Sequence, residues 1–522
     1  MADGFQVARL IPTSGISNQA EAETRATSAL LAVLSIVRDL SSSLLGPLGA
    51  STARKATVNT FIETKFKLAD GTLVRPDGLI QVTYGSNTWK AFVEVKTGDN
   101  PLEAAQINNY LQLAREQGID AVLTISNEIA AGSQHPCEGV KLRANSKVRL
   151  AHYSWTEILS HAVRGKVHRG VDDPEQAWIL GELIRYLEHP ASGAMSFSDM
   201  GAHWVAVRDA AREGTLRRND DAAREVVGRW DQLLRYAALR LGSDTGVEVQ
   251  HVVPKAHADP KVRIGHLLDS LTSSGTLDGV IRVPGAAGNL TVQTDLRARR
   301  VSVSADVIAP TDRGAKARIT WLVRQLGPDT PSATIVEAWG RSARQPIVAT
   351  VAELRENRDL LVDPDKRELL RFRLTQRGEM GQARKDGGRS PGFIESVTDL
   401  VNAFYVTTVQ QILPWTARAP QAAPRPKQPD VVDQPIEDAD QLDDAIEAAR
   451  SIAAEESFAD RAEQDSDDHH LDHDDDRVRE DNDDLDAGST NGPEAVREDV
   501  DLVEAVPPST PPAEFRRDDD RS

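Results

Sequence analysis

The sequence has very little cysteine, few aromatic residues and no long apolar run. Cys137 is the one cysteine among 522 residues, which excludes an intramolecular disulfide and a cysteine-based zinc site and fits a reducing cytosol. The first fifteen residues lack the apolar stretch of a signal peptide, and the most apolar stretch, 28–37, is too short and too polar to span a bilayer. We therefore expect a cytoplasmic protein without a membrane anchor.

Acidic charge is concentrated at one end of the chain. The formal net charge is -19, but residues 421–522 contain 33 acidic and 10 basic side chains, a net of -23. The other 420 residues carry 51 basic and 47 acidic side chains, a net of +4. A body with this charge can approach a phosphate backbone, which would repel a body carrying -19.

The composition changes abruptly after Trp415, where a stretch rich in proline, alanine and glutamine precedes the acidic segment. Such a segment buries too little apolar area to offset its ordering entropy, so we expect a disordered acidic tail over 419–522. The tail could compete with DNA for the basic body, dock a partner protein, or simply solubilise the chain. The length of the remainder favours two domains, which we place at 1–165 and 172–415.

The first domain is predicted to alternate helices and strands, as in an α/β fold. Apolar residues recur at helical spacing over 20–38, and Asn100 as N-cap, Pro101 and Glu103 mark the start of a helix that Gly118 closes. Ser154 and Glu157 form a capping-box pattern before another helix. Strands are expected at 57–67, 73–84, 89–96, 119–126 and 148–153.

The second domain is predicted to be α+β and contains no detectable internal repeat. Helices are expected at 174–187, 202–213, 221–241, 315–326 and 393–413, and strands at 247–253, 276–283, 289–296, 301–308, 333–339 and 369–374. Basic residues cluster at three places in this domain, which suggests nucleic-acid binding or ordinary solvated surface: Arg297, Arg299 and Arg300; Lys316, Arg318 and Arg324; Arg384, Lys385 and Arg389.

The stretch with the clearest chemistry lies on two consecutive strands. Glu94 and Lys96 are two residues apart on one strand, so both side chains point to the same face. Asp77 lies where Pro76 and Gly78 interrupt the previous strand, and a hairpin would bring it to Glu94. Two carboxylates and the backbone carbonyl of Val95 would suit Mg²⁺, with Mn²⁺ as a substitute, because both ions prefer hard oxygen ligands.

Such a metal ion can lower the pKa of a bound water and neutralise charge on a phosphate, while a neighbouring lysine stabilises developing charge. This pattern, Asp77 followed by Glu94-Val95-Lys96, resembles the PD-(D/E)XK motif of restriction-endonuclease-like nucleases, including its proline at Pro76. The expected order of one helix, three strands, a helix and a strand is similar to the αβββαβ core of that superfamily. The resemblance covers 1–165.

Two further features resemble the RecB-type and lambda-exonuclease-type branch of these nucleases. Gln106 and Tyr110 match its QxxxY signature and share one helix face at i,i+4 spacing. That branch commonly takes a metal-site glutamate from its first helix, and Glu23 matches because it shares the face of Thr27 and Leu30, whereas Glu21 does not. The resemblance implies a Mg²⁺-dependent enzyme that hydrolyses DNA, in repair, recombination or defence.

Plainer interpretations exist for each residue. Glu94 and Lys96 could form an ordinary salt bridge on a solvated strand, and the Pro76–Gly78 segment is a common turn sequence. Gln106 and Tyr110 could lie on a helix surface, and Glu23 could complement a helix dipole. At the level of function, the alternatives are an RNA nuclease on the same fold and a non-catalytic module that binds nucleic acid or a protein. The sequence leaves the oligomeric state open.

Overall fold

The computed structural model describes residues 10–11, 18–62, 64–69, 71–130, 135–137, 139–142, 145–194, 197–381, 392–416 and 502–504. All of them belong to one unit of the chain, Met1–Ala417 together with Asp499–Ser522. The basic residues Arg384, Lys385 and Arg389 and nearly all of the acidic tail lie outside the described residues. Within the described residues the chain has a mixed α/β fold with helices and several sheets.

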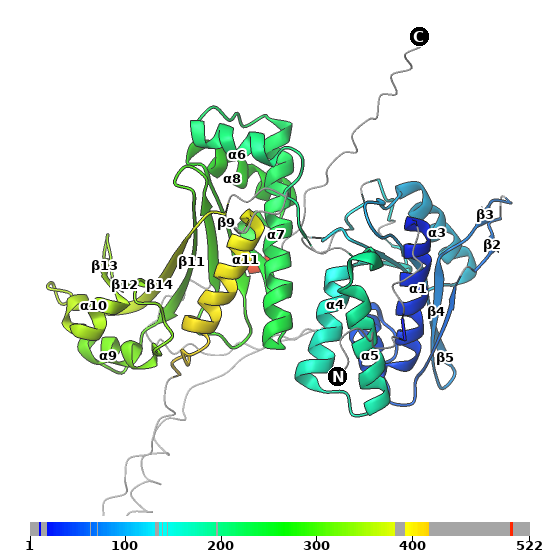
Figure 1. The fold of residues 1–522 in the computed structure, drawn as a ribbon, viewed down its shortest axis with the longest axis horizontal. Helices are drawn as coiled ribbons and strands as arrows, with labels where there is room; N and C mark the ends of the chain where they lie inside the picture. Colours follow the sequence, from blue (N-terminus) through cyan, green and yellow to red (C-terminus); the bar gives the residue numbers. More distant parts are fainter. Residues whose placement is uncertain are drawn as a thin grey trace, which may run out of the picture. The chain divides into compact units, whose positions relative to one another are not determined.

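The first region is built around a five-stranded sheet with helices on both faces (Figure 1). The strand order is β1-β4-β5-β6-β7; the β1–β4 and β4–β5 pairs are antiparallel, whereas β6 runs parallel to both β5 and β7. Its elements are α1 (Gln19–Ile36), α2 (Arg38–Leu45), β1 (Thr57–Ile62), β2 (Phe66–Lys67), β3 (Leu73–Val74), β4 (Gly78–Tyr84), β5 (Asn87–Val95), α3 (Ala104–Gln117), β6 (Ala121–Ser126), β7 (Arg149–Ser154), α4 (Trp155–Val163) and α5 (Pro174–Leu187).

Alternation of side chains along the strands separates two cores. On β4, Ile80 and Val82 are buried while their neighbours are partly exposed, as expected for a strand with one face against a core. That face packs with Val93 and Val95 of β5 against α1, α2, α4 and α5. The opposite face carries Phe92 and packs against α3. The sheet is thus the middle of three layers.

The structure changes three local expectations in the first region. The segment 57–67 contains two strands, because β1 ends at Ile62 and β2 pairs instead with β3 in a separate ribbon. Helix α3 begins at Ala104 with Glu103 as its N-cap residue, so Asn100 does not cap it. Helix α5, which we expected in the second domain, buries Leu180, Leu183 and Tyr186 in the first core, so that core extends to Leu187.

The second region contains an antiparallel sheet whose strand order is β13-β12-β14-β11-β10-β9-β8-β15. Every helix and strand expected between 202 and 413 has a counterpart there, and α8, β13 and α10 are additional. The elements are α6 (Trp204–Glu213), α7 (Asp221–Thr245), β8 (Gln250–Pro254), α8 (Pro260–Ser273), β9 (Thr276–Arg282), β10 (Leu290–Asp295), β11 (Arg300–Ile308), α9 (Ala315–Gln325), β12 (Ile335–Gly340), β13 (Ile347–Thr350), α10 (Val351–Glu356), β14 (Leu369–Glu379) and α11 (Phe393–Phe404).

Two features at the end of the chain differ from expectation. The closing helix α11 continues as a π-helical turn, Tyr405–Val409, and so ends before residue 413. Within the segment expected to be disordered, Leu502–Glu504 forms β15 and pairs antiparallel with Val252–Pro254 at the edge of the sheet.

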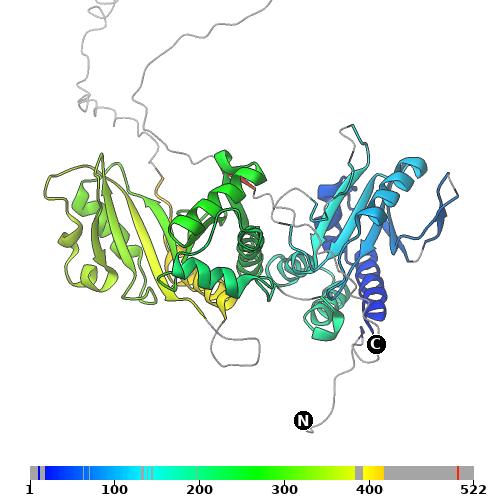
Figure 2. The same cartoon turned by 90° about the horizontal axis from the view of Figure 1, so that it is seen from above.

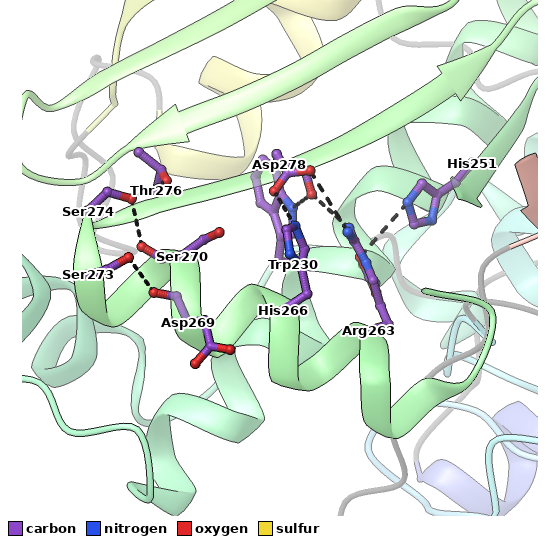
Figure 3. Close-up of polar contacts among 11 residues, drawn as sticks. Trp230, His251, Arg263, His266, Asp269, Ser270, Ser273, Ser274, Thr276 and Asp278 are labelled. Carbon is purple, nitrogen blue, oxygen red and sulfur yellow. Dashed lines mark hydrogen bonds and ion pairs between the residues drawn. The ribbon is translucent and has the colours of Figure 1, made fainter. Parts of the chain in front are cut away.

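A buried ion pair ties α7 and α8 to the sheet of the second region, and Figure 3 shows its arginine, Arg263, beside Asp278 and Trp230. Arg263 on α8 donates to Asp231 on α7 at 2.9 Å and to the backbone carbonyl of Asp278 on β9 at 2.7 Å. The indole of Trp230 donates to the same carbonyl at 3.0 Å. Because Asp231 and Arg263 are both buried and satisfy one another, this cluster has the character of a structural element of the core.

In the part of the chain that the structure describes, no single helix is long and apolar enough to cross a membrane. The pair that reaches the required length, Gln19–Ile36 with Arg38–Leu48, is bent by 106°.

Candidate active site

Asp77, which immediately precedes β4, lies beside Glu94 of the adjacent strand β5. In the antiparallel β4–β5 pair Gly78 is the register partner of Val93, which places Asp77 beside Glu94. The Oδ2 atom of Asp77 accepts a hydrogen bond from the backbone N–H of Val95 at 2.8 Å, which fixes the carboxylate at the end of β5. Gly78 permits this arrangement, because a Cβ atom there would lie 2.5 Å from Leu31 Cδ1 of α1.

Glu94 is held by a cation on one oxygen and a hydroxyl on the other. Lys96 Nζ lies 2.8 Å from Oε1 of Glu94, and the Tyr110 hydroxyl donates to Oε2 at 2.8 Å. Gln106 donates to the Tyr110 oxygen at 2.8 Å. Tyr110 and Glu94 are each 1% exposed. Tyr110 therefore does not lie on a helix surface, and Glu94 does not lie on a solvated strand face.

Helix α1 adds a third carboxylate, that of Glu23. Its Oε2 atom lies 4.0 Å from Lys96 Nζ, and its Oε1 atom accepts a hydrogen bond from the Asn100 side chain. This contact accounts for the different start of α3, because Asn100 pairs with α1 instead of capping its own helix. Glu21 is exposed in the first turn of α1. The structure therefore gathers Glu23, and not Glu21, with the two strand carboxylates.

The backbone that follows Lys96 is fixed by side chains from three other segments. The Trp155 indole donates to the Lys96 carbonyl at 2.9 Å, and Gln19 donates to the Thr97 carbonyl at 2.8 Å. Asn127 donates to the carbonyls of Gly98 and Gly193 at 2.9 and 2.8 Å. Sequence analysis missed Gln19, Asn127 and Trp155, whose contacts span long separations; the one available signal was that Asn127 directly follows the strand beside the motif.

Burial and like charge govern the electrostatics of this cluster. Burial, followed by the repulsion of Asp77, raises the pKa of Glu94 to about 7, although Lys96 and Tyr110 oppose the change. Burial likewise raises the pKa of Asp77, against the hydrogen bond from Val95. For Lys96, burial favours the neutral amine, but the contacts with Glu94, Glu23 and Asp77 outweigh it and raise its pKa. Lys96 is therefore an ammonium ion at neutral pH.

The residues present fit a divalent cation in the chemistry of their oxygen atoms. Burial raises the pKa of both Asp77 and Glu94, and the charge of Asp77 raises that of Glu94 further, so a cation between the two carboxylates would remove that penalty. The Val95 carbonyl, at the end of the same strand, remains the third expected ligand. Among the described residues, no group of three or more histidine, cysteine, aspartate or glutamate side chains is arranged to hold a metal ion.

A cleft between α1 and the sheet opens onto Glu23 and Asp77. Its lining residues come from the first half of α1, the end of β1 and the segment before β4, and they are Ala20, Glu23, Thr24, Thr27, Ile62, Arg75 and Asp77. Two of the three carboxylates thus border the same opening. A ligand entering the cleft would meet Asp77 and Glu23 together.

A second polar group continues across the sheet from Glu94. Thr124 on β6 is the register partner of Glu94, and His152 on β7 is the partner of Thr124. The Thr124 hydroxyl lies 2.7 Å from His135 Nε2 and 3.0 Å from His152 Nδ1. Burial lowers the pKa of His135 to about 4 and that of His152 to about 3, so both rings are neutral at pH 7.

The basic clusters of the second region have mixed roles. Arg318 is buried and donates to the backbone carbonyls of Arg313, Thr311 and Leu369, so it supports the fold. Arg297 donates to the carbonyls of Ala211 and Thr272. These contacts give Arg297 and Arg318 a structural role that requires no nucleic-acid ligand.

Comparisons with protein-family models, with curated proteins and with solved structures found no match to this chain. Its functional interpretation therefore depends on the site and on the motif resemblance.

Proposed function

We propose that the chain is a metal-dependent nuclease that hydrolyses phosphodiester bonds of DNA. The observation that carries the proposal is the set of Asp77, Lys96 and the buried Glu94 at the end of one strand pair, with Tyr110 and Gln106 behind it. An isolated surface salt bridge would not bury Glu94 at 1% exposure beside a second carboxylate, Asp77, whose charge raises the pKa of Glu94.

The roles follow from the contacts. Asp77 and Glu94 would hold Mg²⁺ or Mn²⁺, which when bound supplies a water of lowered pKa and neutralises charge on the phosphate. The Lys96 ammonium is anchored by Glu94 and can orient the attacking water or stabilise the developing negative charge. Glu23 lies near enough to Lys96 to hold it from the helix side, and Tyr110 with Gln106 fixes the rotamer of Glu94.

The test is a cleavage assay with purified full-length protein on single-stranded DNA, duplex DNA and RNA, each with Mg²⁺, with Mn²⁺ and with EDTA. We expect cleavage of DNA that needs the cation and is lost in Asp77→Ala and Lys96→Ala proteins that remain folded. Preferential cleavage of RNA would support the RNA nuclease on the same fold. Binding of nucleic acid without cleavage under every cation would support the non-catalytic alternative.

Two glutamates of α1 provide a matched pair of variants. Glu23→Ala should reduce cleavage, because Glu23 lies beside Lys96, and Glu21→Ala should have little effect. Equal cleavage rates for the two variants would show that Glu23 is not part of the site. The assignment of Asp77, Glu94 and Lys96 would not be affected.

A further inference from the structure

The β2–β3 ribbon is a two-stranded element that stands apart from the five-stranded sheet (Figures 1 and 2). Phe66 pairs with Val74, and Lys67 pairs with Leu73. On the inner face, the Phe66 ring meets Phe92 edge-on at 5.1 Å and Val74 is buried in the same core. The outer face carries Lys67 and Leu73, and Leu73 is 80% exposed. The ribbon is therefore held to the core by its inner face, and its outer face is exposed.

The described side chains of the outer face include cations, one of which lines the cleft. Among residues 64–69 and 71–75 the charged side chains are Lys65, Lys67 and Arg75, all exposed; Glu63 and Asp70 of the same segment lie outside the described residues. Arg75 also lines the cleft and is separated from Asp77 by a single residue. An exposed leucine among three cations, of which Arg75 lines the cleft to Asp77, suits a ligand that has both negative charge and apolar surface.

We propose that the outer face of the β2–β3 ribbon binds a single-stranded segment of nucleic acid and directs it to Asp77; this inference rests on the proposed nuclease function. Lys65, Lys67 and Arg75 would contact successive phosphates, and Leu73 would pack on a base. A single strand is the substrate class that fits, because its bases expose apolar faces that a duplex keeps stacked. A protein ligand fits less well, since one leucine offers little of the apolar core that protein interfaces bury.

The test is binding of an oligothymidine and of a duplex to the full chain carrying Asp77→Asn, measured by fluorescence anisotropy across a salt series. Asparagine can still accept the hydrogen bond from Val95, and this background allows binding to be measured without cleavage. Lys65→Ala/Lys67→Ala should weaken oligothymidine binding about tenfold at low salt and reduce the salt slope by about 0.7 for each phosphate that is no longer neutralised. Leu73→Ser should weaken it about fivefold with an unchanged slope, since part of a leucine loses its burial.

Controls come from the five-stranded sheet, at the end away from the cleft. Lys55 precedes β1, and Tyr84 ends β4 at 46% exposure; Lys55→Ala removes an exposed cation and Tyr84→Ser an exposed large side chain far from the cleft. Losses equal to those of the controls, or equal losses on duplex and single strand, would overturn the inference even if the protein cleaves DNA. If the wild type cleaves no nucleic acid but single-strand binding still depends on the ribbon residues, the ribbon is a binding surface and the proposed nuclease function is wrong.

Discussion

Replacing Glu94 by glutamine should change how stability depends on pH. In the folded chain the pKa of Glu94 is raised from about 4.5 to about 7, chiefly by burial. The folded state therefore binds a proton more tightly than the unfolded state between these two values. The stabilisation that this proton provides is fully present below about pH 4.5 and is lost as the pH rises through about 7. A glutamine side chain cannot titrate, so the variant lacks this contribution at every pH.

The magnitude follows from the size of the shift. At about 1.36 kcal/mol per pKa unit, the rise from 4.5 to about 7 corresponds to roughly 3 kcal/mol. The free energy of unfolding of the wild type, minus that of Glu94→Gln, should therefore fall by roughly this amount between about pH 4.5 and about pH 8. The subtraction removes the titration of other groups that the substitution leaves alone.

Urea unfolding in EDTA at a series of pH values measures this difference directly. Glu21→Gln is the matched control, because it removes an exposed carboxylate from α1 and should give a difference that hardly varies with pH. A wild-type minus Glu94→Gln difference that stays constant over the whole range would refute the claim that burial and Asp77 raise the pKa of Glu94. At about pH 8, millimolar Mg²⁺ should then stabilise the wild type more than the variant, by about 1.4 kcal/mol at ten times its Kd.

Three further outcomes are expected from the contacts described above. The wild type should lose stability as the pH falls below 6.5, because His152 stays neutral in the folded chain but takes up a proton in the unfolded one. In urea unfolding at a series of pH values, His152→Gln should lose less stability over this acidic range. Asp231→Leu or Arg263→Leu alone should cost about 3–5 kcal/mol in chemical unfolding, and the double variant should recover most of it, whereas additive losses would contradict a mutual buried pair. Trp155→Phe keeps a buried ring but removes the hydrogen bond to the Lys96 carbonyl, so it should slow cleavage by about tenfold while costing only about 1 kcal/mol of stability.

Local patterns in the sequence were sufficient to predict the strands of the site. Glu94 and Lys96 share a face because side chains alternate along β5, and Asp77 meets them because β4 and β5 form a hairpin. Helical spacing likewise placed Glu23 on the inner face of α1 and stacked Gln106 on Tyr110. These relations depend on neighbours close in sequence or on one tight turn, which a single sequence specifies.

Relations that depend on distant segments could not be predicted in this way. Asn100 had the features of an N-cap, but its side chain binds Glu23, which is 77 residues away. Asn127 and Trp155 bind the backbone of the motif from segments whose position depends on the whole sheet. Helix α8 was missed although Asp259 caps it and Pro260 occupies its first position, so there the local signal existed and was overlooked.

The charge composition of the two buried polar clusters separates a candidate functional site from a structural one. Asp231 and Arg263 are a buried acid and a buried base, and each satisfies the other with a backbone carbonyl beside them; the partly exposed carboxylate of Asp278 lies 3.9 Å from Arg263 and 3.4 Å from His266. In the first region, three carboxylates, those of Glu23, Asp77 and Glu94, share the single ammonium of Lys96.

With all four groups ionised, that set carries a net charge of about -2, which burial makes costly. The hydrogen bonds from Val95, Tyr110 and Asn100 offset part of this cost but add no positive charge. A divalent cation would balance the set, whereas one additional proton, held by Glu94 near neutral pH, balances only half of it. The excess of negative charge is thus the physical reason to expect a metal ion at the end of β5 and none beside Arg263.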